Sequence, residues 1–191
     1  ARLLESIGPL MDEPKKLYEP LEFYSEAYQK YNNKMWADKL GFDAFKSEDE
    51  EIITELISIL QTVETDMTIF FRLLSKIEKP NIEYIRYAFY DEEKIPDNDW
   101  NNWLNKWWNR VKGKPDRDKM RLSNPKYVLR NWMVQLAIDA AEKEDYSVAE
   151  EIYELLKRPY DEQPEYEDKW FMKRPEWARH RVGCSMLSCS S

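Results

Sequence analysis

The side chains with the most reactive chemistry, two thiols, lie at the end of the chain. The segment "GCSMLSCSS", residues 183–191, holds Cys184 and Cys189, the only two cysteines of the sequence. They could form a local disulfide, one could pair with a cysteine outside this chain, or both could be idle thiols. The closed loop is so short that a local disulfide would contribute only about 2 kcal/mol of chain entropy, compared with about 4–5 kcal/mol for a loop of a hundred residues. From position alone, idle thiols are the leading interpretation, although a chain end favours access and therefore thiol exchange.

Other recognised catalytic and metal-binding patterns are missing. His180 is the only histidine and lies in the basic segment "RPEWARHRV", where an exposed or packed loop histidine is the simplest interpretation. Two cysteines are too few for a structural zinc site with four ligands. Four glycines, at positions 8, 41, 113 and 183, build neither GxxxxGK[ST] nor GxGxxG. We therefore expect no catalytic, cofactor-binding or metal-binding residue in this chain.

Two carboxylate-rich segments could in principle bind a hard cation. The first, "SEDEE" (Ser47–Glu51), is better interpreted as a helix N-terminus, where acidic side chains complement the helix dipole. The second is "YDEQPEYED" (Tyr160–Asp168), here called the strap. Its acids alternate with Tyr160 and Tyr166, so we interpret it as a rigid segment whose tyrosines pack on helices, with a ligand role as the alternative.

The segment "WNNWLNKWW", residues 100–108, suggests either base stacking or a packed core. Stacking platforms for single-stranded nucleic acid have a basic groove, but only Lys106, Arg110 and Lys112 are nearby. The tryptophans recur at helical spacing, which favours core packing.

Composition and net charge limit the classes of partner that this chain could bind. The chain has 191 residues, is 42% hydrophobic and 35% charged, and carries a formal net charge of −8. Bulk binding to nucleic acid or to an anionic membrane is therefore not expected. No apolar run approaches the roughly 20 residues that a membrane span needs. The opening "ARLLESIGPL" has no initiator Met and resembles the interior of a longer protein, so we expect this chain to be a piece.

Helical periodicity runs through most of the sequence, and no segment shows a convincing strand alternation. We therefore predict an all-α fold with a helical region over residues 1–157, followed by the strap and a cysteine-containing tail over residues 158–191. The expected helices cover residues 19–40, 47–63, 66–77, 81–90 (a short one), 97–111, 124–145 and 147–158. Ser47 and Glu50 would form a capping box at the start of the second helix, and Asp66 would cap the third. Asn124 would cap the helix over 124–145, with Pro125 in its first turn.

Three segments of the sequence resemble the C-terminal end of the selenoprotein O family. They are "NPKYVLRN" at Asn124–Asn131, "RPYDEQP" at Arg158–Pro164, and the cysteine-serine terminus. The likeness covers residues 124–191 strongly, and "DMTIFFRLLS" at Asp66–Ser75 is similar more loosely.

The resemblance implies a protein-kinase-like fold that binds ATP in a flipped orientation and, with Mg²⁺ or Mn²⁺, transfers AMP to Ser, Thr or Tyr hydroxyls of protein substrates. The family's nucleotide-binding and metal-binding residues lie in its N-terminal lobe and mid-chain, and nothing in this sequence matches them. This chain would be the helical C-lobe and its C-terminal extension, with the missing N-terminal kinase-like region as its partner. The parent would be mitochondrial in a eukaryote and cytoplasmic in a bacterium.

The same resemblance separates the two cysteines. Cys189 stands in the place of the family's C-terminal selenocysteine, which in some members is thought to form a redox link to a cysteine near the activation segment. Cys189 is therefore the implied redox residue, with Cys184 as a further candidate.

The alternative function is a non-catalytic helical binding or scaffold module. A Gly-rich loop, a lone strand Lys and a metal-binding Asp upstream of Ala1 in the parent would favour the enzyme, and their absence would favour the module.

Overall fold

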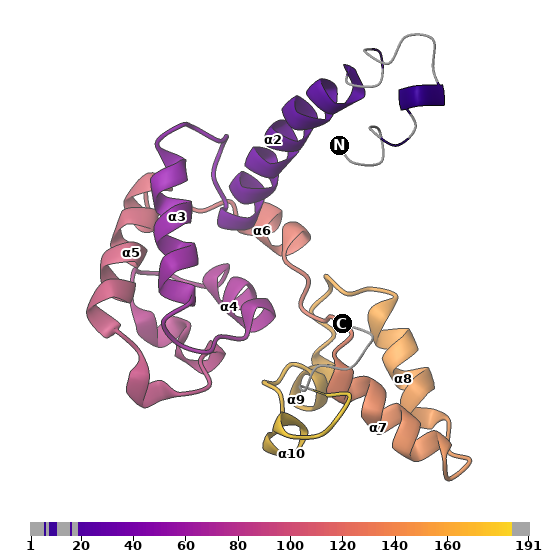
Figure 1. The fold of residues 1–191 in the computed structure, drawn as a ribbon. Helices are drawn as coiled ribbons and strands as arrows, with labels where there is room; N and C mark the ends of the chain where they lie inside the picture. Colours follow the sequence, from indigo (N-terminus) through magenta and orange to yellow (C-terminus); the bar gives the residue numbers. More distant parts are fainter. Residues whose placement is uncertain (1–5, 7, 11–15, 17–18, 185–191) are drawn as a thin grey trace.

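A computed structural model of the chain describes residues 6, 8–10, 16 and 19–184 (Figure 1). The α-helices are α2 (Glu19–Leu40), α3 (Asp49–Leu60), α4 (Met67–Leu74), α5 (Asp97–Arg110), α6 (Arg117–Ser123), α7 (Asn131–Ala141), α8 (Ser147–Leu156), α9 (Glu167–Trp170) and α10 (Glu176–Arg179). Short 3₁₀ turns lie at Gly8–Leu10, Ile82–Tyr84, Arg86–Ala88, Glu92–Lys94 and Pro164–Tyr166. Within these residues the β-structure is limited to isolated bridge positions, Thr65 paired with Phe89 and, near the C-terminal end, Val182, so the all-α prediction is confirmed.

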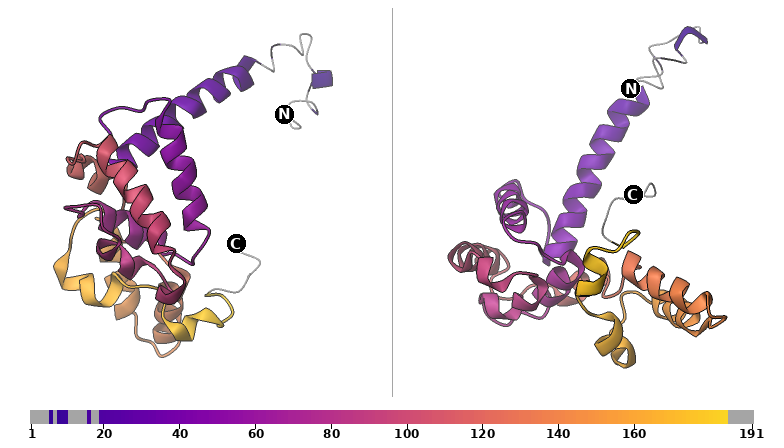
Figure 2. Two further views of the ribbon diagram at one scale, coloured as in Figure 1. Left: turned by 90° about the vertical axis from the view of Figure 1, so that its left-hand side faces the viewer. Right: turned by 60° about the horizontal axis from the view of Figure 1, so that its bottom comes forward.

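The helices form two groups joined through α6 (Figure 1). Helices α3, α4 and α5 make the first group, and α7 and α8 pack side by side with α9 and α10 in the second. Helix α2 packs on α6 at its C-terminal end and extends away from both groups, as the two further views show (Figure 2). None of the described helices is long and apolar enough to cross a membrane.

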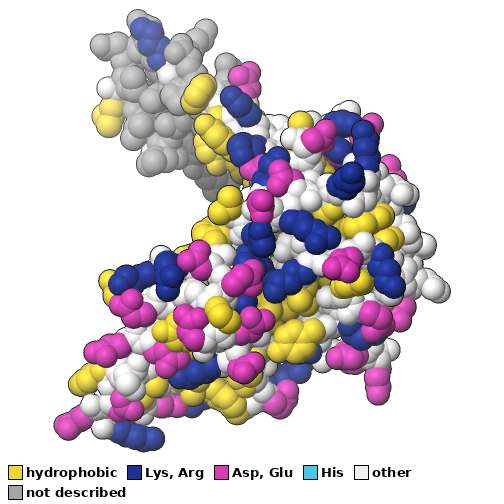
Figure 3. Space-filling view, turned by 180° about the vertical axis from the view of Figure 1, so that it is seen from behind, with side chains coloured by type: hydrophobic (Ala, Val, Ile, Leu, Met, Phe, Trp, Pro, Cys, Tyr) yellow, Lys and Arg dark blue, Asp and Glu magenta, His cyan; other side chains and the backbone are white. Residues whose placement is uncertain are grey.

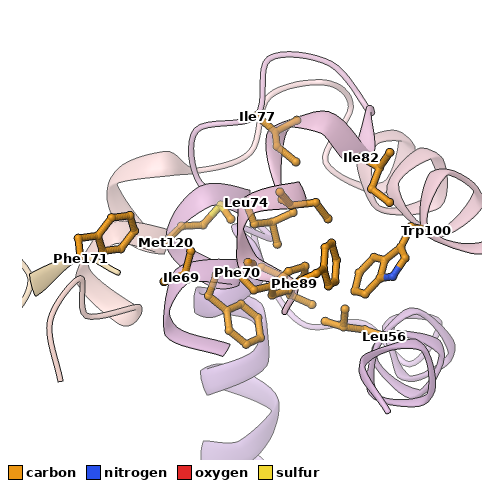
Figure 4. Close-up of a cluster of buried hydrophobic side chains, with 14 of the residues drawn as sticks. Leu56, Ile69, Phe70, Leu74, Ile77, Ile82, Phe89, Trp100, Met120 and Phe171 are labelled. Carbon is orange, nitrogen blue, oxygen red and sulfur yellow. The ribbon is translucent and has the colours of Figure 1, made fainter. Parts of the chain in front are cut away.

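The tryptophans of α5 form the centre of the core, as their spacing predicts. Trp100, Trp103 and Trp107 are buried, and the rings of Trp103 and Trp107 stack with centroids 6.3 Å apart. The indole N–H of Trp103 donates to the carbonyl of Ile52 at 2.8 Å, and that of Trp107 donates to the carbonyl of Leu40 at 2.9 Å. Figure 4 shows Trp100 beside Phe89 and Phe70 in the same cluster. Burial of each such ring contributes about 2–3 kcal/mol, so this cluster holds α5 against α3 and α4.

The Asp66 cap is confirmed, because its carboxylate accepts the backbone N–H of Ile69 at 3.1 Å. The Ser47 capping box is wrong. Helix α3 begins at Asp49 with no side-chain cap, and the buried Asp49 carboxylate instead accepts the backbone N–H of Lys46 and pairs with Arg110. The first residue of α3 is therefore held both by the local Lys46 backbone and by Arg110 of α5.

The predicted helix start at Asn124 is also wrong, because α7 begins only at Asn131. Asn124 follows α6, and its amide donates to the carbonyls of Lys39 and Met120 at 3.0 and 2.8 Å. Pro125 disfavours the α conformation at the residue before it, and Asn124 is extended with ψ 99°. The segment 81–90, predicted as a short helix, instead forms the two 3₁₀ turns and the bridge residue Phe89.

Candidate functional site

Of the two cysteines, the structure describes Cys184, whereas Cys189 lies outside the described residues. Cys184 is buried, with 7% of its surface exposed, and its N–H donates to the carbonyl of Arg181 at 3.1 Å. The Arg181 guanidinium in turn binds both carboxylate oxygens of Asp139 on α7, at 2.7 and 2.8 Å. These hydrogen bonds from Arg181 hold the pKa of Asp139 below its ordinary value. The start of the tail is therefore fixed to α7.

His180 follows α10 and is exposed. Across the part of the chain that the structure describes, no group of three or more His, Cys, Asp or Glu side chains is arranged to hold a metal ion.

The strap forms ion pairs with two buried cationic side chains, Lys126 and Arg72. Lys126, on the segment between α6 and α7, has a fully buried side chain. Its ammonium donates to the carbonyl oxygen and a carboxylate oxygen of Glu162, at 2.7 and 3.2 Å, and to Glu167 at 2.7 Å. The neighbouring Tyr127 hydroxyl contacts the carbonyls of Glu162 and Gln163, both at 3.1 Å. The adjacent side chains of Lys126 and Tyr127 thus both hydrogen-bond to the same turn of the strap.

Arg72 reaches the same glutamate from α4. Its side chain is 1% exposed and its guanidinium donates to the carbonyls of Arg121, Asn124 and Tyr160, at 3.2, 3.2 and 3.1 Å. It also forms an ion pair with Glu162. One buried cation therefore links α4, α6 and the strap. We call Arg72, Lys126, Glu162 and Glu167 the strap clamp.

The strap clamp fixes the charge of its members. Burial raises the pKa of Glu162, but the charge and hydrogen bonds of Arg72, with those of Lys126, outweigh burial and lower its pKa to about 2. Burial lowers the pKa of the Lys126 ammonium, but its bonds to Glu167 and Glu162 outweigh that effect and its pKa lies above the ordinary value. Both groups stay ionised at neutral pH, so neither is poised to exchange a proton.

The strap turns sharply at Gln163, which has a left-handed backbone with φ 41°. This conformation is costly for a residue with a Cβ. The Gln163 amide donates to the carbonyls of Leu155 and Arg158 at 3.1 and 2.8 Å, which ties the turn to the end of α8. Tyr166 packs against the core, whereas Tyr160 is 42% exposed.

The strap clamp orders the backbone; it does not present a reactive group. Sequence reasoning identified the strap but missed Arg72 and Lys126. The signal was present in "MTIFFRLL", where a single arginine interrupts an apolar helix and needs a carboxylate partner once buried. The acids of the strap supply that partner.

The described residues thus form an all-α fragment in which the strap clamp fixes the backbone of several segments. Comparison with known proteins is more specific. The sequence profile of the family described as "Protein adenylyltransferase SelO" matches residues 1–157. The chain therefore belongs to the SelO family.

Several relatives carry the name "Protein nucleotidyltransferase YdiU", and three of them illustrate the match. The one from Flavobacterium johnsoniae is 46% identical over 100% of this chain, and the match spans 39% of the relative. Those from Aromatoleum aromaticum and Rhodopirellula baltica are both 41% identical, over 100% and 99% of this chain and 38% and 39% of their own lengths. The chain thus spans about two fifths of the length of the curated relatives that it matches.

Proposed function

We propose that the protein containing this chain is a protein adenylyltransferase. A Ser, Thr or Tyr hydroxyl of a protein substrate would attack the α-phosphorus of ATP, form a phosphodiester to AMP, and release pyrophosphate and the hydroxyl proton. ATP and Mg²⁺ or Mn²⁺ would be bound by the kinase-like region outside this chain. The observation that carries the proposal is the match of the whole chain, at 46% identity, to a protein named a nucleotidyltransferase.

In this proposal the described helices support the active site and do not contain it. The strap clamp supports this role, because two buried cations fix the backbone of three separate segments without leaving a free acid or base. The compartment remains a prediction: mitochondrial in a eukaryote, cytoplasmic in a bacterium.

A pair of labels tests the transfer. The full-length protein is incubated with a protein acceptor, a divalent cation and ATP labelled on either the α- or the γ-phosphate. We expect the acceptor to gain the α label and not the γ label. Gain of the γ label would instead show a kinase, and gain of neither would favour the scaffold alternative. The 191-residue chain alone is the control, and we expect it to transfer nothing.

We also propose Cys189 as the residue through which the full-length protein responds to redox conditions. Its thiol and a thiol outside this chain would form a disulfide by exchange with a low-molecular-weight disulfide. That small disulfide would take up the two electrons and two protons and leave as two thiols. The burial of Cys184 supports this assignment, since access governs thiol exchange. Activity is compared with and without reductant: we expect Cys189→Ser to abolish the response and Cys184→Ser to keep it. An unchanged response in Cys189→Ser would defeat the assignment.

A further inference from the structure

Helix α2 carries an aromatic stripe that nothing among the described residues covers. Tyr24, Tyr28, Tyr31 and Met35 recur at steps of four, three and four, so they lie along one side of the helix. Their exposed fractions are 65, 58, 67 and 43%. The rings of Tyr24 and Tyr28 stack on each other with centroids 6.1 Å apart. We call these four residues the α2 stripe.

The α2 stripe lies on the side of the helix opposite its buried residues. Ala37 and Leu40, the buried residues of the helix, lie on a different side of it at 100° per residue. Helix α2 rests on α6 near its end, and its first half extends outward (Figure 2). In Figure 3 apolar side chains gather along this extending helix.

The stripe runs into an apolar groove at the base of the helix. A hollow of about 340 Å³ lies there, lined mainly by the apolar side chains of Met35, Trp36, Met67, Phe71 and Pro125, with Lys39, Thr68 and Asn124 also at its surface. Stripe and groove are therefore one continuous apolar surface, and contiguous exposed apolar patches mark interaction sites.

A helix of this kind needs a partner. Most of the stability of helices in proteins comes from tertiary packing of the apolar side, and short isolated helical segments are marginal in water. Tyrosine rings supply a large apolar area, and each hydroxyl seeks a hydrogen-bond partner when buried. A surface that presents apolar side chains with hydrogen-bond acceptors at its edge would therefore match the α2 stripe.

We propose that the α2 stripe and its groove are the docking surface for the part of the same polypeptide that lies outside this chain. More than half of the length of the matching relatives lies outside the match, so a large occupant is available. A covalently linked occupant has an effective concentration on the order of millimolar, which a separate molecule rarely reaches. A second copy is disfavoured because each chain carries a net charge of −8. The inference rests on the proposed function only in taking the chain to be part of a longer protein.

Site-specific photocrosslinking in the full-length protein tests the docking surface. The photoreactive residue p-benzoylphenylalanine replaces Tyr28 in one variant and Tyr31 in a second. It replaces Tyr153 of α8, which is 65% exposed and so matches them, in the control. We expect crosslinks at positions 28 and 31 within one polypeptide, to residues outside the 191-residue chain, and clearly weaker crosslinking at position 153.

Every other outcome overturns the proposal. A covalent dimer would assign the surface to a second copy, a crosslink to residues 1–18 would assign it to this chain's own N-terminal segment, and a yield no higher than the control would leave it uncovered. Hydrogen exchange gives a second readout without substitution: amides 24–31 should exchange more than about tenfold more slowly in the full-length protein than in the 191-residue chain. Neither readout needs AMP transfer, so a protein that crosslinks as expected but transfers no AMP would refute only the proposed function.

Discussion

Glu162→Gln removes the shared carboxylate of the strap clamp while keeping its size and one acceptor oxygen. In the folded protein the pKa of Glu162 is about 2, against 4.5 for an ordinary glutamate. Each tenfold difference in ionisation corresponds to about 1.4 kcal/mol, which sets an upper limit of about 3 kcal/mol. Because the side chain is 42% exposed, solvent screening reduces the expected loss to about 1–2 kcal/mol.

The pH dependence follows from the sign of this shift. A carboxyl whose pKa is lower in the folded state stabilises the fold fully above its unfolded pKa, and that stability is lost as pH falls towards the folded pKa. The difference between wild type and Glu162→Gln should therefore be constant from pH 7 to about 5 and should shrink steadily as pH falls from 4.5 towards about 2.

Urea unfolding followed by tryptophan fluorescence measures this difference. A loss of about 1–2 kcal/mol lowers the midpoint by roughly 0.5–1 M urea at neutral pH. The matched control is Glu165→Gln, an exposed acid of the same strap, which should change the midpoint by less than about 0.2 M. Equal midpoint shifts in the two variants, or a Glu162→Gln difference that does not shrink at acidic pH, would refute the clamp as described.

Two further changes probe the fold. Trp107→Ala should lower the free energy of unfolding by about 3–5 kcal/mol, because this ring is fully buried. Trp177→Ala, at a position 44% exposed, should lower it by less than about 1 kcal/mol. If calorimetry finds similar losses for the two variants, the α5 rings are not the centre of the core. Gly41→Ala places a Cβ 2.8 Å from Met120 Sδ, whereas Gly183→Ala meets its nearest atom at 3.7 Å, and both backbones have positive φ. Gly41→Ala should therefore cost about 1–3 kcal/mol more than Gly183→Ala, and equal thermal midpoints would exclude the clash.

Local patterns predicted the parts of the fold that depend on nearby residues. The helix at 19–40, the Asp66 cap and the buried face of α5 all follow from periodicity and capping. Asn124 followed by Pro125 has the same local signature as a helix start, yet its amide bonds to Lys39, 85 positions away. No local pattern contains that partner.

The candidate site was harder to predict for the same reason. Arg72 and Glu162 are 90 positions apart, and only the fold brings them together. The α2 stripe illustrates the converse, because its spacing predicts a helix correctly but cannot say whether the chain itself covers the apolar side. Here the described residues do not.

Identifying the product decides whether the full-length protein transfers AMP, as proposed. The purified full-length protein is incubated with ATP, Mg²⁺ or Mn²⁺ and an acceptor protein, and the acceptor is sequenced by tandem mass spectrometry. We predict an adenylate group on Ser, Thr or Tyr side chains, lost when either ATP or the metal is omitted. An acceptor that carries phosphate in place of adenylate, or that stays unmodified, would contradict AMP transfer by this protein.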